Sequence, residues 1–255
     1  MTASEASSSA TIVTAAILVI GDEILSGRTK DKNIGYIAEY LTNIGIELRE
    51  VRVVPDVTEE IVAALNALRG RYSYVFTTGG IGPTHDDITA DSVAAAFGVG
   101  IDYDPRAVAM LSERFSPTEL NEARMRMARI PAGAELIANA ISKAPGFNIG
   151  NVYVMAGVPA IMQAMLDVVA PTLRTGTKIL SDTVRAGLRE GDIGGPLAEI
   201  ARAHPAVSIG SYPFWSETGP DTNIVVRSRE ADKLQAAMAA VKAMIDAENS
   251  KRKGE

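Results

Sequence analysis

The sequence contains no cysteine, only two histidines and a single tryptophan. Without thiols there is no disulfide framework, no thiolate metal site and no cysteine nucleophile, and the reducing cytoplasm is the expected compartment. No uninterrupted apolar run is longer than Ala15 to Ile20, far below the roughly 20 residues that a membrane-spanning helix needs. The sequence therefore predicts a protein without a membrane segment.

Positive charge is also scarce, because the 255 residues carry a formal net charge of −6. A duplex-binding protein usually presents a basic face, so nucleic acid is not an expected partner. A local exception is the basic cluster of Arg124, Arg126 and Arg129, which we interpret as a solvated helix face. An anionic small ligand remains compatible with this charge, because a few main-chain amides can hold a phosphate inside an acidic protein.

The chain begins with a Ser- and Ala-rich stretch that lacks a basic region, so residues 1–13 are predicted to be a disordered leader and not a signal peptide. From Thr14, short apolar runs alternate with amphipathic stretches, which is typical of parallel βαβ units. The predicted strands are Ala15–Ile20, Ile46–Val54, Tyr72–Thr78 and Val152–Met155, and the predicted helices are Asn33–Asn43, Thr58–Leu68 and Pro159–Leu173.

The remaining segments give weaker patterns. Asp102 to Ala128 is predicted as two helices, and Leu136 to Asn148 as irregular structure. The pattern changes after Gly176, where strands and helices suggest a small α+β unit with an antiparallel sheet. We expect a main domain over residues 14–174, this small unit over 175–250 and a frayed tail over 251–255.

A glycine-rich loop follows the third predicted strand, with the sequence Thr77-Thr78-Gly79-Gly80-Ile81-Gly82-Pro83-Thr84-His85-Asp86-Asp87-Ile88-Thr89. Glycines at this place let main-chain N–H groups approach a ligand, and a helix predicted to begin near Asp87 would favour an anion. Two carboxylates beside an anion call for a divalent cation, and Mg²⁺ is commonly held by carboxylates and phosphate oxygens together. The alternative is a tight turn with Asp as the helix cap.

The whole string resembles the signature of the MoaB/Mog-like molybdopterin-binding family, and within it the amino-terminal domain of CinA-type competence proteins. The pattern Gly-Gly-Leu-Gly-Pro-Thr-x-Asp-Asp-x-Thr is matched throughout, with Ile81 in place of leucine. Further stretches resemble the other segments of that family: Ile20–Gly27 with Asn33, Asn121–Pro131, Lys143–Phe147 and Gly157–Pro159. The resemblance implies an α/β three-layer sandwich with a mostly parallel sheet, the MogA-like fold, plus a small C-terminal α+β appendage.

The resemblance also implies roles for single residues. Glu23, Asp86 and Asp87 are the catalytic candidates, with Asp86 and Asp87 as ligands of Mg²⁺ or another divalent cation; for Glu23 the alternative is a solvated turn residue. The implied ligand contacts come from the four matching segments: Gly21, Asp22, Asn33, Thr78, Gly79, Gly80, Gly82, Pro83, Thr84, Lys143, Gly157 and Pro159. Three positions depart from the family pattern, because Ser142 replaces a glycine, Ala156 a proline and Ile161 a glutamate.

Three functions follow as alternatives. The first is binding of a phosphorylated pterin, such as molybdopterin, or of a nucleotide. The second is metal-dependent hydrolysis of a pyrophosphate such as ADP-ribose or FAD, in which a metal ion would activate water. The third is a catalytically silent assembly protein, suggested by the three departures. In each case we expect a homo-oligomer.

Overall fold

The computed structural model describes residues 11–217 and 219–254. Most of the leader expected at residues 1–13 lies outside these residues. Its last residue, Val13, is buried, and its carbonyl oxygen accepts a hydrogen bond from the N–H of Glu47. Residues 11–13 therefore belong to the folded part. The chain forms two compact units, Thr11–Gly176 and a second one that begins at Thr177.

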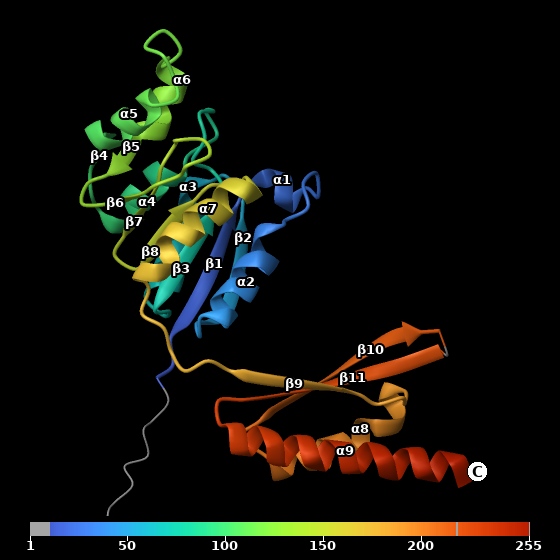
Figure 1. The fold of residues 1–255 in the computed structure, drawn as a ribbon. Helices are drawn as coiled ribbons and strands as arrows, with labels where there is room; N and C mark the ends of the chain where they lie inside the picture. The colour runs from blue at the N-terminus through green and yellow to red at the C-terminus, as the bar shows by residue number, and fades with distance from the viewer. Residues whose placement is uncertain (1–10, 218, 255) are drawn as a thin grey trace, which may run out of the picture. The chain divides into compact units, whose positions relative to one another are not determined.

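A six-stranded sheet with the order β2-β1-β3-β8-β7-β6 lies at the centre of the first unit (Figure 1). Four strands pair in parallel: β1 (Thr14–Ile20), β2 (Glu47–Val54), β3 (Tyr74–Thr78) and β8 (Val152–Met155). Two further strands extend the sheet in antiparallel pairing: β7 (Gly146–Ile149) and β6 (Glu135–Ile137). A short antiparallel pair, β4 (Ile101–Tyr103) and β5 (Arg129–Pro131), lies outside this sheet.

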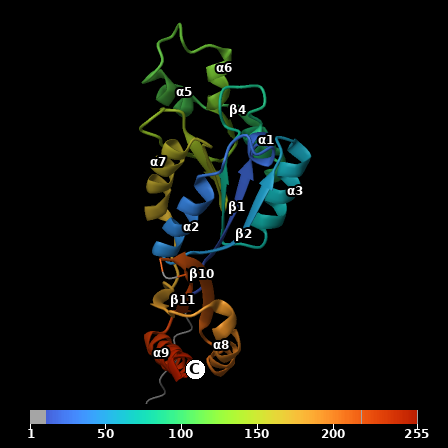
Figure 2. The ribbon, with the colours of Figure 1, turned by 90° about the vertical axis from the view of Figure 1, so that its right-hand side faces the viewer.

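Helices cover both faces of the sheet, as the side view shows (Figure 2). One face packs against α2 (Asn33–Asn43) and α7 (Pro159–Val169), and the other against α3 (Thr58–Arg69), α4 (Thr89–Phe97) and α5 (Pro105–Ser112). The central strand β1 is buried from both sides, which explains its continuous apolar sequence. The α/β three-layer fold with a mostly parallel sheet is confirmed.

For the segment between β3 and β8, one expectation was wrong and another holds with shorter helices. Leu136–Asn148, predicted as irregular, holds the strands β6 and β7; they are only three and four residues long, so the turn residues between them dominated the pattern. The two helices expected over Asp102–Ala128 shorten to α5, α6 (Glu122–Met125) and the 3₁₀ turn η1 (Arg126–Ala128). Pro105 opens α5, and the Asp104 carboxylate accepts from the N–H of Arg106, which is a typical helix start.

The second unit is a small α+β fold. Its antiparallel sheet has the order β10-β11-β9, formed by Ser208–Ser216, Gly219–Ser228 and Leu180–Arg185. Helices α8 (Glu190–Ala203) and α9 (Ala231–Gly254) share a core with the sheet that includes Ile193, Ile224 and Val241. Residues 251–254, expected as a frayed tail, continue α9. No helix within residues 11–217 and 219–254 is long and apolar enough to cross a membrane.

Candidate functional site

The candidate site lies where the parallel strands end. Along the chain, β1 is followed by β2 on one side and β3 on the other, so the crevice between the ends of β1 and β3 is a topological switch point, where open α/β sheets bind ligands. Two adjoining clefts open there. Residues on their common border are Glu23, Thr29, Gly79, Gly157 and Pro159.

The ends of β1, β3 and β8 approach so closely that only glycine fits between them. Gly79 has φ 103°, and a Cβ there would lie 2.1 Å from the carbonyl oxygen of Ile20. A Cβ at Gly157 would lie 3.2 Å from the Cα of Gly79. Bare main chain therefore forms the floor of the clefts, and a ligand can approach its N–H groups directly.

The glycine loop after β3 is held in shape by Asp87. Its Oδ2 accepts hydrogen bonds from the N–H of Thr84 over 2.8 Å and from the hydroxyl of Thr84 over 2.5 Å. A Cβ at Gly82 would lie 2.6 Å from the same oxygen, so the carboxylate fills the space beside that glycine. Asp87, expected as a catalytic and metal-ligating residue, is thus placed as a support of the loop.

The helix after the loop begins at Thr89 and not near Asp87. The N–H of Thr89 donates to the carbonyl oxygen of Gly80 over 3.0 Å, and its hydroxyl donates to that of Gly79 over 3.0 Å. The first N–H of α4 is therefore used within the loop. By contrast, no hydrogen bond joins the N–H groups of Gly80, Ile81 and Gly82 to another residue of the described part, which leaves these donors for an anion.

The smaller cleft, of about 220 Å³, has more polar and charged lining residues than the larger one, and we call it the polar cleft. Asn33 and Thr78 line it, and both are almost fully buried, with 4% and 1% of their surface exposed. Oδ1 of Asn33 and Oγ1 of Thr78 have no hydrogen-bond partner among the described residues. Buried polar atoms are normally paired, so these two atoms are suited to contact a bound group. Lys30 and Lys32 also line this cleft and bring positive charge.

Local contacts hold Asn33 in position. Asp31 caps the start of α2, since its Oδ1 accepts from the N–H groups of Asn33 over 3.1 Å and of Ile34 over 2.8 Å. Nδ2 of Asn33 donates to the carbonyl oxygen of Gly157 over 2.8 Å. Asp31 was not among the expected site residues, although an Asp two residues before a predicted helix is a sequence signal for a cap.

Several carboxylates gather beside the end of β1. A Cβ at Gly21 would meet the Glu23 carboxylate at 2.5 Å, so this side chain folds over the strand end. Oδ2 of Asp56 accepts from the N–H of Asp22 over 2.9 Å. Burial raises the pKa of Asp56, and the negative charges of Asp22, Glu23 and Asp86 raise it further, against the opposing effect of that hydrogen bond. Asp56 was not expected from the sequence.

Asp86 lies at the exposed edge of this group. Hydrogen bonding within its own turn lowers the pKa of Asp86 below the usual value, so the carboxylate is charged at neutral pH. The His85 ring lies 3.9 Å from it and is almost entirely exposed. Within the described part of the chain, no three Asp, Glu or His side chains lie close enough to hold a metal ion by themselves. A cation at Asp86 would need oxygen ligands from the bound molecule.

The larger cleft, of about 570 Å³, is mainly apolar, and we call it the apolar cleft. Gly79 to Pro83 and Asp87 line its side toward the loop. The opposite walls come from the segment after α5, from η1 and from α7, with the side chains of Arg114, Phe115, Met127, Ile161 and Met165. Ser142, Ala144, Ala156 and Val158 complete the lining, together with the residues of the common border.

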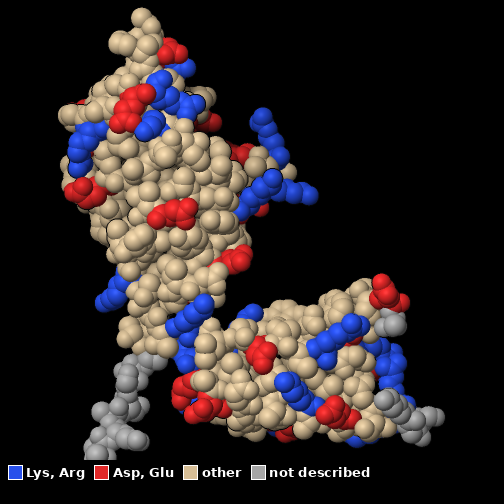
Figure 3. Space-filling model, viewed as in Figure 1, with Lys and Arg blue, Asp and Glu red and all other residues tan. Residues whose placement is uncertain are grey.

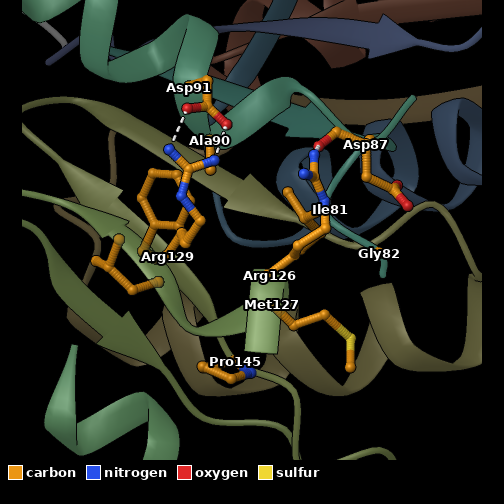
Figure 4. A pocket seen from close by; sticks show the side chains of 12 residues that line it. Ile81, Gly82, Asp87, Ala90, Asp91, Arg126, Met127, Arg129 and Pro145 are labelled. Atoms are coloured by element: carbon orange, nitrogen blue, oxygen red, sulfur yellow. Dashed lines mark hydrogen bonds and ion pairs between the residues drawn. The ribbon is translucent and has the colours of Figure 1, made fainter. Parts of the chain in front are cut away.

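A third hollow, of about 20 Å³, lies against the same loop and holds no more than about one water molecule (Figure 4). Two of the three clustered arginines, Arg126 and Arg129, meet the loop and α4 here and are not part of a solvated face. Arg129 makes a bidentate ion pair with Asp91, over 2.7 and 2.6 Å, and Arg126 donates to the carbonyl oxygen of Asp87 over 3.4 Å. Arg126 thus supports the loop and Arg129 supports α4, and neither contact was predicted from the sequence.

One expected ligand contact lies elsewhere. Nζ of Lys143 pairs with the Glu113 carboxylate over 2.6 Å, and this lysine lines a separate hollow with Asn139 and Val168. It is not among the residues that line the polar or the apolar cleft. The other expected contacts stand around the two clefts, lining them or in the strand-end turns: Gly21, Asp22, Asn33, Thr78, Gly79, Gly80, Gly82, Pro83, Thr84, Gly157 and Pro159.

Comparisons with known proteins identify the families that the two units match. Residues 16–175 match the family described as probable molybdopterin binding domain, and residues 178–253 match the middle domain of FAD synthase. A protein of Aeropyrum pernix is 34% identical and covers 89% of this chain and 90% of its own. The crystal structure of the protein CinA from Thermoplasma acidophilum is 33% identical, covers 63% of this chain and 98% of its own, and has a TM-score of 0.60.

A probable FAD synthase of Caenorhabditis elegans is 28% identical over 91% of this chain. The chain spans about half the length of that relative, 50%. The first unit has the fold and glycine loop of one family, and the second matches a domain that FAD synthases carry. The chain therefore belongs to the probable molybdopterin binding domain family, and it carries a FAD synthase middle domain after that domain.

Proposed function

We propose that the first unit binds a phosphorylated nucleotide or pterin with its phosphates at Gly80–Gly82 and its polar groups at Asn33 and Thr78. The observation that carries this proposal is the pair of buried oxygens, Oδ1 of Asn33 and Oγ1 of Thr78, that have no partner among the described residues. A buried polar atom without a partner costs free energy, and a ligand that pairs with it recovers that cost. The neighbouring N–H groups and Lys30 and Lys32 suit phosphate oxygens.

A nucleotide is the ligand that we favour. Two relatives that cover 91% of this chain carry the name probable FAD synthase, and the second unit matches the middle domain of FAD synthase. Both matches support a flavin or adenine nucleotide over molybdopterin, which stays the second choice.

The described carboxylates can hold a divalent cation only together with oxygen atoms of the bound ligand. Asp86 and Glu23 would hold it with their carboxylates, and phosphate oxygens would complete its shell, as is usual for Mg²⁺. When bound, the ion neutralises phosphate charge and polarises the phosphoryl group. The carboxylates of Asp22 and Asp56 add negative charge beside it.

Hydrolysis of the ligand's pyrophosphate is a second candidate, favoured by the carboxylates at the end of β1. In this reaction the oxygen of water bonds to one phosphorus, the bond from that phosphorus to the bridging oxygen breaks, the protons of the water pass to the solvent, and two phosphomonoesters leave. The chain's own contribution is to hold the two phosphates against Gly80–Gly82 and Lys30. Release of AMP from FAD or ADP-ribose, with and without Mg²⁺, tests this candidate. Turnover that an Asp86→Ala variant leaves unchanged would exclude the site.

Binding is tested with two adjacent threonines on opposite faces of β3. Isothermal titration with FAD, ADP-ribose and a molybdopterin precursor is run in the presence of Mg²⁺ on the wild type, Thr78→Val and Thr77→Val. Both hydroxyls are buried without a partner among the described residues, but only Thr78 lines a cleft. We expect about tenfold weaker binding for Thr78→Val and an affinity within twofold for Thr77→Val. No binding of any of the three ligands by the wild type would overturn the proposal.

We further propose that the protein is cytoplasmic and forms a homo-oligomer. Light scattering after size-exclusion chromatography tests the second part, and a mass of one 26.9 kDa chain would contradict it.

A further inference from the structure

The sheet of the second unit has two different faces. Both helices of this unit, α8 and α9, lie on one face (Figure 1), and each strand contributes an apolar side chain to the core there, namely Val184, Ile209 and Ile224. Successive side chains of a strand point to opposite faces, so the residues next to these three point away from the helices. We call this second surface the open face. Its residues used below are Tyr212, Phe214, Arg185, Asn223 and Arg227.

Two aromatic rings of β10 lie on the open face. The Tyr212 side chain is 47% exposed, and its ring lies over Gly210, where a Cβ would come within 3.0 Å of the ring. Phe214 follows two positions later, about 7 Å along the strand, and the Arg185 guanidinium lies 5.5 Å from the centre of its ring. Arg185 is held there by the Asp221 carboxylate, over 2.5 Å. The open face therefore offers neighbouring aromatic and guanidinium surfaces on which flat rings stack.

Polar and positive groups lie beside the two rings. Asn223 is paired in register with Tyr212 on one side and with Arg185 on the other, and its amide both donates and accepts hydrogen bonds. Arg227 lies further along β11, is exposed, and has the small residues Ser208 and Ser181 as its register partners. It forms no ion pair with another described residue. Its guanidinium group is thus free to meet a phosphate.

The charge of the second unit differs from that of the whole chain. Residues 177–254 contain eleven Lys and Arg and ten Asp and Glu, whereas the whole chain contains 25 and 31. On the side seen in Figure 3, positive and negative side chains of this unit are interspersed. The acidic excess that argued against a nucleic acid partner therefore lies outside this unit.

A further strand is a less suitable partner than a molecule on the open face. β10 is an edge strand, and Pro213 removes one main-chain N–H from it. Proline in an edge strand opposes pairing with another chain. The side chains of the open face, and not the main chain of this edge, are therefore the available binding groups.

We propose that the open face of the second unit binds single-stranded nucleic acid, with bases stacked on Tyr212 and Phe214 and a phosphate at Arg227. Unpaired bases stack on aromatic side chains of exposed sheets and on guanidinium groups, and amides pair with their edges. Asn223 to Arg227 spans about 13 Å of β11, which suits a segment of two or three nucleotides. The bases of a duplex are already stacked on one another and cannot use these rings. This inference goes beyond the proposed function, because it concerns the other unit and another ligand class.

The first measurement tests stacking. Fluorescence anisotropy of a labelled single strand of mixed sequence, about 12 nucleotides long, is recorded as RNA and as DNA on the full chain, Tyr212→Ala and Trp215→Ala. Trp215 is the matched control: it lies in the same strand and is 83% exposed, but its position puts it on the opposite face. We expect about tenfold weaker binding for Tyr212→Ala and a change of less than twofold for Trp215→Ala. A duplex of the same sequence should bind the wild type at least tenfold more weakly than the single strand.

The second measurement tests the phosphate contact. The affinity for the single strand is determined over a range of salt concentrations for the wild type, Arg227→Ala and Arg202→Ala. Arg202 lies in α8, has a side chain that is 70% exposed, and pairs with Glu199, so it controls for the loss of one positive charge. We expect Arg227→Ala to lower the slope of log K against log salt by about 0.7, and Arg202→Ala to leave it unchanged. Tyr212→Ala should weaken binding without changing this slope, because it removes no charge.

Three outcomes would overturn the proposal. The first is a wild type that binds no single strand; if it then elutes as a dimer and Tyr212→Ala as a monomer, the open face is a contact between copies of the chain. The second is an equal loss of affinity in Tyr212→Ala and Trp215→Ala, with melting used to show that both are folded; Tyr212→Leu replaces an unfolded Tyr212→Ala. The third is duplex binding as tight as single-strand binding. FAD binding, measured in parallel, should stay within twofold of the wild type in every variant, so that failure of either proposal is read separately.

Discussion

Nδ2 of Asn33 donates a hydrogen bond to the main-chain carbonyl of Gly157 over 2.8 Å, although 124 positions separate the two residues. This bond joins the start of α2 to the turn between β8 and α7, on the border of the polar cleft. It uses the amide nitrogen and leaves Oδ1 buried without a partner among the described residues. The same side chain thus joins two segments of the fold and carries the oxygen that we propose contacts the ligand.

The two roles of Asn33 are separable by comparison with Asn151. Nδ2 of Asn151 donates to the carbonyls of Arg69 and Tyr72, each over 3.0 Å, at the opposite end of the sheet. Asn33→Ala leaves one carbonyl unpaired and Asn151→Ala leaves two, and each unpaired carbonyl should cost about 1–3 kcal/mol, or roughly 2–10 °C in melting temperature. Only Asn33→Ala should also weaken FAD binding, by about tenfold or more. Equal losses of affinity in both variants would show that Asn33 acts through stability alone.

Gly79 provides a test of the close approach between strand ends. Gly79→Ala should destabilise the first unit by more than 3 kcal/mol, because its Cβ would lie 2.1 Å from the Ile20 carbonyl oxygen and the residue has φ 103°. Gly133 has φ 83° with nothing within 4 Å of an added Cβ, so Gly133→Ala should cost only the roughly 1–2 kcal/mol of positive φ. Urea unfolding of both variants measures the difference. Similar losses would mean that the conformation, and not the contact, requires glycine.

Much of the frame of the site follows from local sequence patterns. The apolar run in β1, the spacing of Ile37 and Leu41 in α2 and the glycines after β3 predict a parallel sheet with a loop at its carboxyl edge, and all are present. The roles of Asn33 and Gly157 came from the family resemblance, since nothing local marks a residue whose partner is 124 positions away.

The contacts that escaped prediction are long-range. Asp56 follows Pro55 and looks like a turn residue; its place depends on the N–H of Asp22, 34 positions earlier. Lys143 matches a family segment, but Glu113 captures its ammonium group. Phe115 and Met127 lie in or beside the predicted helices of Asp102–Ala128, whose fold into a cleft wall depends on packing that periodicity does not reveal.

Asp86 and Asp87 are adjacent in the sequence but should respond differently to substitution. Asp86 is exposed, and among the described residues its carboxylate supports no main-chain group outside its own turn. Asp86→Asn should therefore shift the melting temperature by less than about 2 °C and weaken Mg²⁺-dependent FAD binding about tenfold. Asp87→Ala removes the acceptor for the N–H of Thr84 and should cost about 0.5–2 kcal/mol, like the loss of a helix cap.

The variant Asp87→Asn decides between support and metal binding at that position. Its amide oxygen still accepts from Thr84, so stability and affinity should both stay near those of the wild type. If Asp87→Asn weakens Mg²⁺-dependent binding as much as Asp86→Asn does, Asp87 is a metal ligand and the supporting role is secondary. Titration calorimetry with and without Mg²⁺ reads out both variants.

Asp56 predicts a dependence of stability on pH. Its pKa is raised above 3.8 by burial and by neighbouring carboxylates, so the folded state holds the proton more tightly than the unfolded state. Stability therefore falls as the pH rises from 3.8 through the folded pKa, and the charged carboxylate opposes folding at neutral pH.

Asp56→Asn removes this charge and keeps an acceptor for the N–H of Asp22. In the absence of Mg²⁺ the variant should melt about 1–3 °C above the wild type at pH 7, and the difference should vanish as the pH approaches 3.8. Mg²⁺ with FAD should narrow the difference at pH 7, because a bound cation offsets the same repulsion. Calorimetric melting of both proteins across this pH range measures the difference in melting temperature. If Asp56→Asn instead melted further above the wild type as the pH fell, the hydrogen bond from Asp22, and not repulsion, would dominate at Asp56.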